Sequence, residues 1–142
     1  MPRAKLELPA KFHFSTEIHV RISDINYNDH LGNDAVLSII HEARVRFYNN
    51  YGFTELNVEG AGTIMSDAIL VYKSESHYGD VVKVEIAVND LQKKGFDFLY
   101  LLTNKTTAKE IARAKTGIVF YDYQDRKIVD MPPKFRSLFQ AS

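Results

Sequence analysis

The stretch RISDINYNDHLGNDAVLSIIHEAR, residues 21–44, decides how this chain is organised. Its first half is rich in Asp, Asn and Gly, which favour turns and helix N-caps because short polar side chains bond nearby backbone groups. Its second half begins an amphipathic helix with 3.6-residue spacing, whose apolar stripe is Val36, Ile39, Ile40, Ala43 and Phe47. We expect this helix to be capped by Asn33 or Asp34 and to end just before Gly52.

Segments with an alternating, two-residue period lie on both sides of this helix. Polar and apolar residues alternate over 11–23, which predicts a long strand with one buried face. Four more strands are expected after the helix, at 63–73, 82–88, 96–102 and 110–123. The links between them are short, as in hairpins of antiparallel neighbours. Pro132 and Pro133 end the sheet, and KFRSLF (134–139) predicts a last helical turn.

One strand, one long helix and four strands in sequence limit the possible folds. A single helix beside an antiparallel sheet buries its apolar stripe only by lying across the concave face. We therefore expect an α+β hotdog fold, a long central helix wrapped by five to six antiparallel strands, forming a single domain over 1–142. One side of the helix and one sheet edge remain open in this arrangement. A homo-oligomer, either a dimer or a dimer of dimers, is therefore expected.

Composition excludes several classes of function. Lys plus Arg and Asp plus Glu both number 18, so there is no overall positive charge to favour nucleic acid as a partner. The chain has no cysteine, which excludes disulfides, thiolate metal sites and a cysteine nucleophile. It shows neither a signal-peptide core nor the roughly 20 apolar residues that span a membrane, so a cytoplasmic protein without membrane association is expected. The five histidines show no close ligand spacing, so neither a metal nor a cofactor is predicted.

Residues 21–44 also resemble the signature of 4-hydroxybenzoyl-CoA-thioesterase-like hotdog enzymes. That signature has Arg, two residues, Asp-x-Asp, a Gly-containing turn, His-Val-Asn-Asn, and a helix with Glu-Ala-Arg. The matching positions are Arg21, Asp24, His30, Asn33, Glu42, Ala43 and Arg44. The resemblance implies hydrolysis of an acyl-CoA or acyl-carrier thioester to free acid and thiol. The chain departs from it at Asn26, where the family has a catalytic Asp, because a neutral amide cannot act as a general base.

The residues around the helix start are the first candidates for the site. The resemblance places an oxyanion-binding N–H at Asn33, where the positive end of the helix dipole can polarise a thioester carbonyl. Gly32 would let the backbone approach the substrate, although both residues are also ordinary helix starters. Asn26 is a candidate for orienting the carbonyl or water, or for a simple Asx-turn. His30 is a candidate base or substrate donor, or a structural partner of the backbone.

Three carboxylates are further candidates. A second hotdog branch has Asn or Gln at the position of Asn26 and its catalytic carboxylate two turns into the helix. That spacing reaches His41, one residue before Glu42, so Glu42 is predicted to be catalytic unless it only pairs with Arg46. Asp67 interrupts an apolar strand, which indicates either a catalytic carboxylate near the dimer seam or a solvent-facing edge strand. Asp24 is predicted to contact substrate, or to form a turn.

Two other functions remain open. Asp24-x-Asn26 followed by His30 is similar to the Asp-x-Asn-Pro…His motif of (R)-specific enoyl-CoA hydratases, although Tyr27 replaces the Pro. The Asn at position 26 also suits a non-catalytic acyl-CoA-binding protein.

Overall fold

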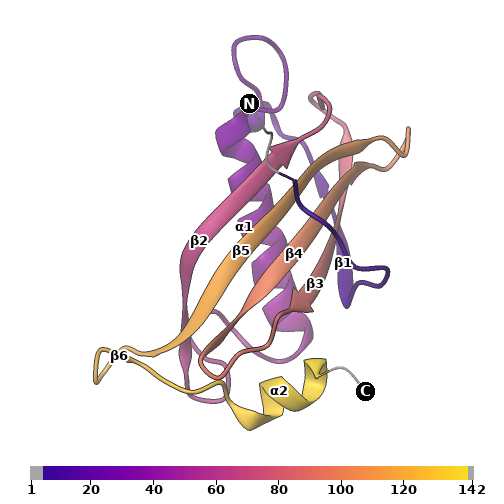
Figure 1. Ribbon diagram of the computed structural model, residues 1–142. Coiled ribbons are helices and arrows are strands. Elements are labelled where there is room, and N and C mark those ends of the chain that lie inside the picture. The colour runs from indigo at the N-terminus through magenta and orange to yellow at the C-terminus, as the bar shows by residue number, and fades with distance from the viewer. Residues whose placement is uncertain (1–4, 141–142) are drawn as a thin grey trace.

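The computed structural model describes residues 5–140, which form a strongly curved sheet with two helices (Figure 1). The elements in chain order are β1 (Phe14–His19), a 3-10 turn η1 (Ile22–Asp24), α1 (Asn33–Asn50), β2 (Gly62–Tyr72), β3 (Val81–Asn89), β4 (Gly95–Asn104), β5 (Glu110–Asp122), β6 (Lys127–Ile128) and α2 (Pro133–Phe139). The five long strands and α1 were predicted from periodicity, and α2 falls where a last helical turn was expected after Pro132. The two-residue β6 was not, because so short a strand has no measurable period.

All strand pairs in the sheet are antiparallel. The strand order is β1-β3-β4-β5-β2, and β6 pairs with the end of β5. β2 is therefore an edge strand, although it is the first strand after the helix, because it pairs with β5 rather than with β3. The meander β3-β4-β5 has short connections, as expected.

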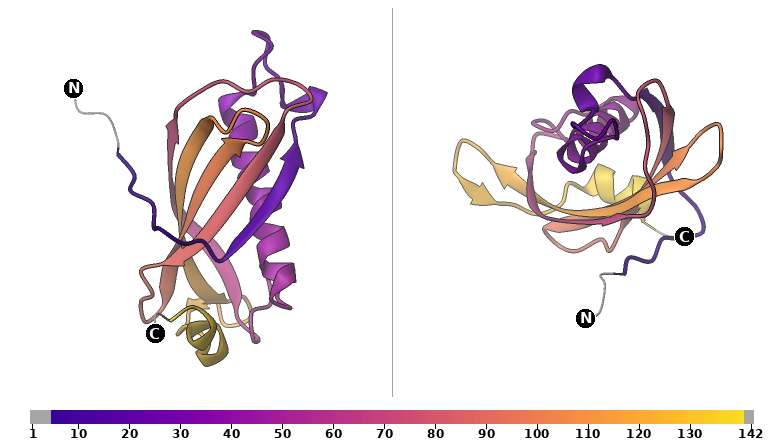
Figure 2. Two further views of the ribbon diagram at one scale, coloured as in Figure 1. Left: turned by 90° about the vertical axis from the view of Figure 1, so that its right-hand side faces the viewer. Right: turned by 90° about the horizontal axis from the view of Figure 1, so that it is seen from above.

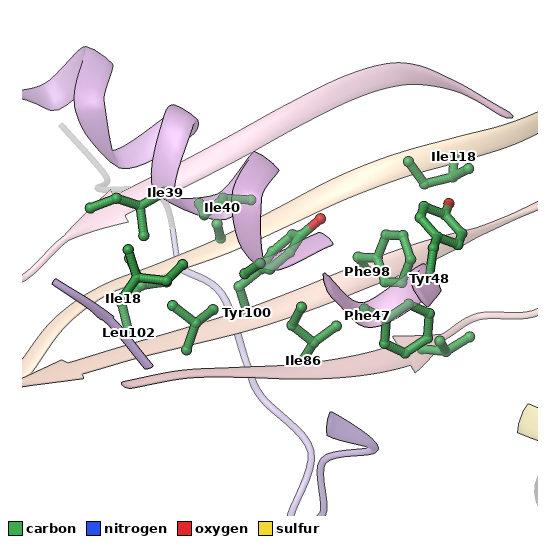
Figure 3. Packing of buried hydrophobic residues seen from close by; sticks show 14 of the residues in the cluster. Ile18, Ile39, Ile40, Phe47, Tyr48, Ile86, Phe98, Tyr100, Leu102 and Ile118 are labelled. Carbon is green, nitrogen blue, oxygen red and sulfur yellow. The ribbon is translucent and has the colours of Figure 1, made fainter. Parts of the chain in front are cut away.

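Helix α1 packs on the concave face of this sheet through the predicted stripe. Val36, Ile39, Ile40, Ala43 and Phe47 are all buried there. They meet the inward side chains of β3 and β4, among them Ile86, Phe98 and Leu102 (Figure 3). The N-cap is Gly32, so the predicted cap at Asn33 or Asp34 was wrong by one or two residues. Gly52, with φ of 79°, follows the helix as predicted.

The second helix, α2, lies on the same side of the sheet as α1 (Figure 2). Phe135 and Phe139 are buried, and the Phe135 ring lies 4.7 Å from that of Phe96 and 5.4 Å from that of Phe120. An antiparallel sheet of six strands with a helix on one face agrees with the predicted hotdog fold. α1 has 18 residues and shares the concave face with α2, so the sheet encloses two helices. No helix within residues 5–140 is long and apolar enough to cross a membrane.

Candidate functional site at the start of α1

The loop before α1 is shaped by its own side chains and backbone. Ile25 and Leu31 form an isolated antiparallel bridge, and Asn26 N–H donates to the His30 carbonyl at 2.9 Å. Asn26 Oδ1 accepts from the N–H groups of Asn28 at 2.9 Å and His30 at 3.3 Å. Asn26 thus forms the predicted Asx-turn. Its Nδ2 makes no hydrogen bond within residues 5–140, so the amide still has donors to offer to a ligand.

The first turn of α1 presents free backbone donors. Gly32 provides no side-chain cap, and the first paired amide is that of Val36, which donates to the Gly32 carbonyl at 3.2 Å. The first N–H groups of a helix have no partner inside the helix, and the dipole makes this end favourable for negative charge. A Cβ at Gly32 would lie 2.7 Å from Asp34 Oδ1, so a glycine here also avoids crowding that carboxylate.

A cavity of about 270 Å³ lies beside this helix start. It is lined by Asn26, His30, Leu31, Asn33, Val36, Tyr72, Lys73, Ser74, Glu75, Ser76 and Ile111. The Tyr72 hydroxyl donates to the Asn33 carbonyl at 3.2 Å, which ties the end of β2 to the first turn of α1. Three of the seven predicted site residues, Asn26, His30 and Asn33, therefore line one cavity, and Gly32 is the cap between them.

The loop after β2 brings a carboxylate to His30. Glu75 Oε2 lies 3.3 Å from His30 Nε2, and the His30 side chain is 34% exposed. The two loops are joined next to this pair, because Leu31 N–H donates to the Ser76 carbonyl at 2.7 Å. A carboxylate on one imidazole nitrogen fixes the orientation and tautomer of the ring. The pair is therefore suited to moving a proton at the rim of the cavity.

Asp24 occupies a different environment. Its side chain is buried, and Oδ2 accepts the Arg21 N–H at 2.8 Å, while Oδ1 faces the Arg21 guanidinium at 3.3 Å. Its carbonyl accepts Gly32 N–H at 2.9 Å. Asp24 does not line the cavity, so the geometry assigns its side chain to the turn, the alternative that its sequence context left open.

Glu42 faces away from this cavity, on the β1 side of α1. Its Oε2 lies 2.9 Å from Arg46 Nε, and Arg46 in turn donates to Thr16 Oγ1 and to the Glu17 carbonyl. His41, one residue earlier, contacts a different carboxylate: its Nε2 is 2.9 Å from Glu55 Oε1. The structure therefore does not bring Glu42 to the α1 start within one chain, and it pairs Glu42 with Arg46.

Asp67 lies on the outer face of the sheet, away from α1. A bulge at Ser66 shifts the register, so Met65 pairs with Ile118 while Asp67 pairs with Gly117. The extra residue turns the strand over, so Asp67 faces the side opposite to Met65 and is exposed, as in the solvent-facing alternative. Asp67 is exposed on the edge strand and lines an outer cavity of about 420 Å³ that also contains Lys93, Lys94 and Asp97.

The outer cavity has mixed charge. Lys115 lies 4.0 Å from Asp97, and Lys94 lies 2.8 Å from Asp130, which holds the pKa of the Asp130 carboxyl below its usual value. Burial raises the pKa of Asp97, although Lys115 partly opposes this. Lys94 and Lys115 therefore already face carboxylates.

Two histidines lie closer together than the sequence indicated. The rings of His30 and His77 are 5.8 Å apart, and together with Glu75 they form a group whose ligand atoms all lie within 4.8 Å of one another. The sequence spacing of the histidines gave no sign of this group. His30 and His77 are 47 positions apart in sequence and share no local spacing, so only the fold reveals this group.

Comparison with models of protein families shows to which family this chain belongs. The model of the thioesterase-like superfamily matches residues 20–139, which include every cavity residue described above. The chain belongs to the thioesterase-like superfamily. No curated protein matches this superfamily member by sequence.

Solved structures share the fold of this thioesterase-like chain. A 1,4-dihydroxy-2-naphthoyl-CoA thioesterase from Synechocystis superposes with a TM-score of 0.80 at 20% identity, covering 89% of this chain and 94% of its own. A thioesterase superfamily protein from Jannaschia sp. CCS1 has a TM-score of 0.82 at 16% identity, with 92% and 83% covered. The gentisyl-coenzyme A thioesterase BH1999 has a TM-score of 0.76 at 18% identity, with 87% and 99% covered.

Tyr72 and Glu75 were not assigned a role in the site from the sequence. Tyr72 lies near the end of a predicted strand, where an aromatic residue suggests no chemical role. Glu75 sits in the polar run SESHYGD, where nothing distinguishes a site residue from a solvated loop. Both enter the site only because β2 pairs with β5 and directs the following loop to the α1 start.

Proposed function

We propose that this chain hydrolyses an acyl-CoA thioester in the cavity at the start of α1. The observation that carries the proposal is the uncapped first turn of α1 opening beside the His30–Glu75 pair. Membership of the thioesterase-like superfamily supports thioester hydrolysis as the reaction and an acyl-CoA as the substrate. α1 would then serve as the central helix of a hotdog unit that forms one domain over 1–142.

The reaction needs a polarised carbonyl, a positioned water and a base. In this proposal the thioester oxygen accepts the Asn33 N–H, where the helix dipole stabilises the developing oxyanion. His30 removes a proton from the attacking water, held in orientation by Glu75. Asn26 donates from Nδ2 to the substrate or to the water. The new C–O bond forms, the C–S bond breaks, and the protonated imidazole returns the proton to the departing thiolate.

Hydrolysis by His30 resolves the difficulty posed by Asn26. A neutral amide cannot replace the family's catalytic Asp as a base, whereas an imidazole with a carboxylate partner can. His30 and Asn26 belong to the same short loop, and the side-chain Oδ1 of Asn26 accepts a hydrogen bond from the backbone N–H of His30. Asn26 would thus place the base and contribute a donor.

We further propose that two copies assemble along β2. This edge strand exposes Met65, Ile69 and Tyr72, and α1 exposes Leu37 and Val45. An unpaired edge with apolar side chains is a template for a second strand. The assembly would be a dimer or a dimer of dimers, and the location that we propose for it is the cytoplasm. Catalytic roles for Glu42 and Asp67 depend on such a partner, because each lies away from the α1 start in its own chain.

The experiment is thiol release from a panel of acyl-CoAs of different chain length and aromatic character. Because the chain has no cysteine, a thiol reagent reports coenzyme A without background from the protein. Loss of the base should lower the rate of His30→Gln by about 10² to 10⁴-fold. His19→Gln, which changes an exposed histidine on β1, serves as the control and should remain active.

Two alternative outcomes separate the other functions. Loss of the crotonyl-CoA double bond without thiol release would indicate a hydratase. That outcome would require an acid other than Asp24, whose carboxylate is buried against Arg21. Tight acyl-CoA binding without turnover, unchanged in His30→Gln, would indicate a non-catalytic binding protein.

A further inference from the structure

We infer that His30, Glu75 and His77 form a site for a divalent transition-metal ion at the rim of the α1 cavity. Zn²⁺ is the ion that we expect there. Each residue offers one ligand atom, and the three atoms lie within 4.8 Å of one another. This is the only such group of three among residues 5–140. Two imidazoles and one carboxylate suit Zn²⁺ and its first-row neighbours, whereas Mg²⁺ and Ca²⁺ prefer sites made of oxygen alone.

The distances are close to those that a bound ion requires. Ligand atoms about 2.0–2.1 Å from a tetrahedral Zn²⁺ are separated from one another by roughly 3.4 Å. His30 Nε2 and Glu75 Oε2 already lie 3.3 Å apart. The remaining ligand atom, on His77, lies within 4.8 Å of the others, and the His77 side chain is 58% exposed, which leaves it free to turn toward an ion.

The backbone around the three ligands is held in place from both loops. Leu31 N–H, next to His30, donates to the carbonyl of Ser76, which lies between Glu75 and His77 and is 1% exposed. Gly79 N–H donates to the Val20 carbonyl at 3.1 Å, which anchors the far end of the same loop. The positions of the ligands are therefore fixed by the fold, and an ion would need to order only side chains.

Asp80 supplies an outer carboxylate for His77. Its Oδ2 accepts from Ser76 Oγ at 3.1 Å, from His77 N–H at 2.9 Å and from Asn104 Nδ2 at 3.2 Å. The same oxygen lies 3.8 Å from His77 Nδ1. A carboxylate that accepts one ring N–H of a histidine directs the other nitrogen to a metal and strengthens it as a ligand. At 3.8 Å the His77 ring does not yet donate to Asp80, so this support would form only when the ring turns toward the ion.

The fourth position of the ion would face the cavity, because His30 and Glu75 both line it. Glu75 faces His30 Nε2, so Nδ1 is the nitrogen that accepts the proton from water. An ion bound to Nε2 leaves the proton of the neutral imidazole on Nδ1, so neither nitrogen keeps a free lone pair. On the proposed function, occupancy therefore withdraws His30 as the base, and Zn²⁺ acts as a reversible inhibitor of hydrolysis. This second part rests on the proposed function, whereas the site itself does not.

Calorimetric titration of untagged, EDTA-treated protein with ZnCl₂ tests the site. We expect one Zn²⁺ per chain, and affinity at least about tenfold weaker in His77→Asn, Glu75→Gln and Asp80→Asn. His41→Asn is the matched control, because His41 also contacts a carboxylate but belongs to no group of three. Its Zn²⁺ affinity should equal that of the unchanged protein. Absence of stoichiometric binding, or binding that survives His77→Asn, would overturn the site.

The effect on hydrolysis is measured separately, through the thioester absorbance, since free thiols bind Zn²⁺. Zn²⁺ should slow the unchanged protein by at least about tenfold at saturation, and EDTA should restore the rate. His77→Asn should keep its metal-free rate and resist Zn²⁺. Full occupancy without inhibition would refute the link to His30. A metal-free protein that hydrolyses no acyl-CoA would refute the proposed function, while the calorimetry would still decide the site.

Discussion

Replacing Tyr100 by Phe tests how α1 is held on the sheet. Arg44, 8% exposed, reaches from the helix into the core, and its Nη1 donates to the Tyr100 hydroxyl at 3.2 Å. The Tyr100 hydroxyl also lies 2.7 Å from Thr116 Oγ1, and both residues are fully buried. Burial raises the pKa of Tyr100, so the hydroxyl remains neutral and can serve both partners. The variant removes one oxygen and leaves the ring packing intact.

The expected loss of stability follows from the two lost contacts. A hydrogen bond to a charged group contributes about 1.5–3 kcal/mol, and a neutral one about 1 kcal/mol. Because a buried guanidinium and a buried hydroxyl lose a partner together, we expect Tyr100→Phe to lower the free energy of unfolding by about 2–4 kcal/mol. At about 2.1 cal/mol/K per residue, the unfolding entropy of a chain of this length makes that a fall in Tm of roughly 7–13 °C.

Urea unfolding followed by far-UV circular dichroism measures this loss, since the chain has no tryptophan. The protein concentration is kept constant because an oligomer's stability depends on it. Tyr51→Phe is the matched control: its hydroxyl donates to the His13 carbonyl at an exposed position, where water replaces it. We expect a change within about 1 kcal/mol there. Equal midpoints for Tyr100→Phe and the unchanged protein would refute this account of the core.

Three other measurements address the site, the outer cavity and the edge strand. Asn26→Asp keeps the acceptors for Asn28 and His30 but loses the Nδ2 donor, so kcat/KM should fall about tenfold, and a gain would refute the donor role. Burial raises the folded-state pKa of Asp97 above 3.8, so the folded state loses stability as pH rises from 3.8 through that pKa. Asp97→Asn should therefore raise Tm at neutral pH, and the gain should shrink on acidification; an equal gain at both pH values would contradict the cause. Ile69→Lys should dissociate the proposed oligomer in sedimentation velocity, whereas Leu56→Lys should not, and a monomeric unchanged protein would contradict the β2 interface.

The sequence predicted the long elements well because apolar residues recur in each of them with the period of a helix or of a strand. The α1 stripe and the alternation in β3 are local patterns that burial imposes on consecutive residues. The bulge at Ser66 was missed because one inserted residue leaves the composition of β2 unchanged while it turns Asp67 to the other face. The cap was missed because Asn33 and Asp34 are stronger N-capping residues than Gly32. The helix nevertheless begins at Asn33, which makes Gly32 the N-cap.

The site was predictable only where it is local. Asn26, His30 and Asn33 lie within eight positions, and the turn-rich composition before a helix indicated their importance. Glu75 joins them through the Leu31–Ser76 backbone contact between two loops, which leaves no trace in either segment. The placement of Glu42 was uncertain because consecutive residues of a helix point about 100° apart. A difference of one residue in the preceding loop therefore decides which side chain faces a given direction. That direction decides whether a carboxylate faces Arg46 or a substrate.

The pairing of β2 with β5 has a consequence for how the chain folds. Thr63 lies opposite Phe120, so this strand pair closes a loop that contains all of β3 and β4. Contacts between residues so far apart in sequence slow folding, because loop entropy is lost before the contacts form. During synthesis β2 leaves the ribosome well before its only hydrogen-bonding neighbour in the chain. Until β5 is synthesised, the backbone groups along both edges of β2 have no partner strand, and its apolar side chains are exposed. We expect aggregation to compete with folding at that stage.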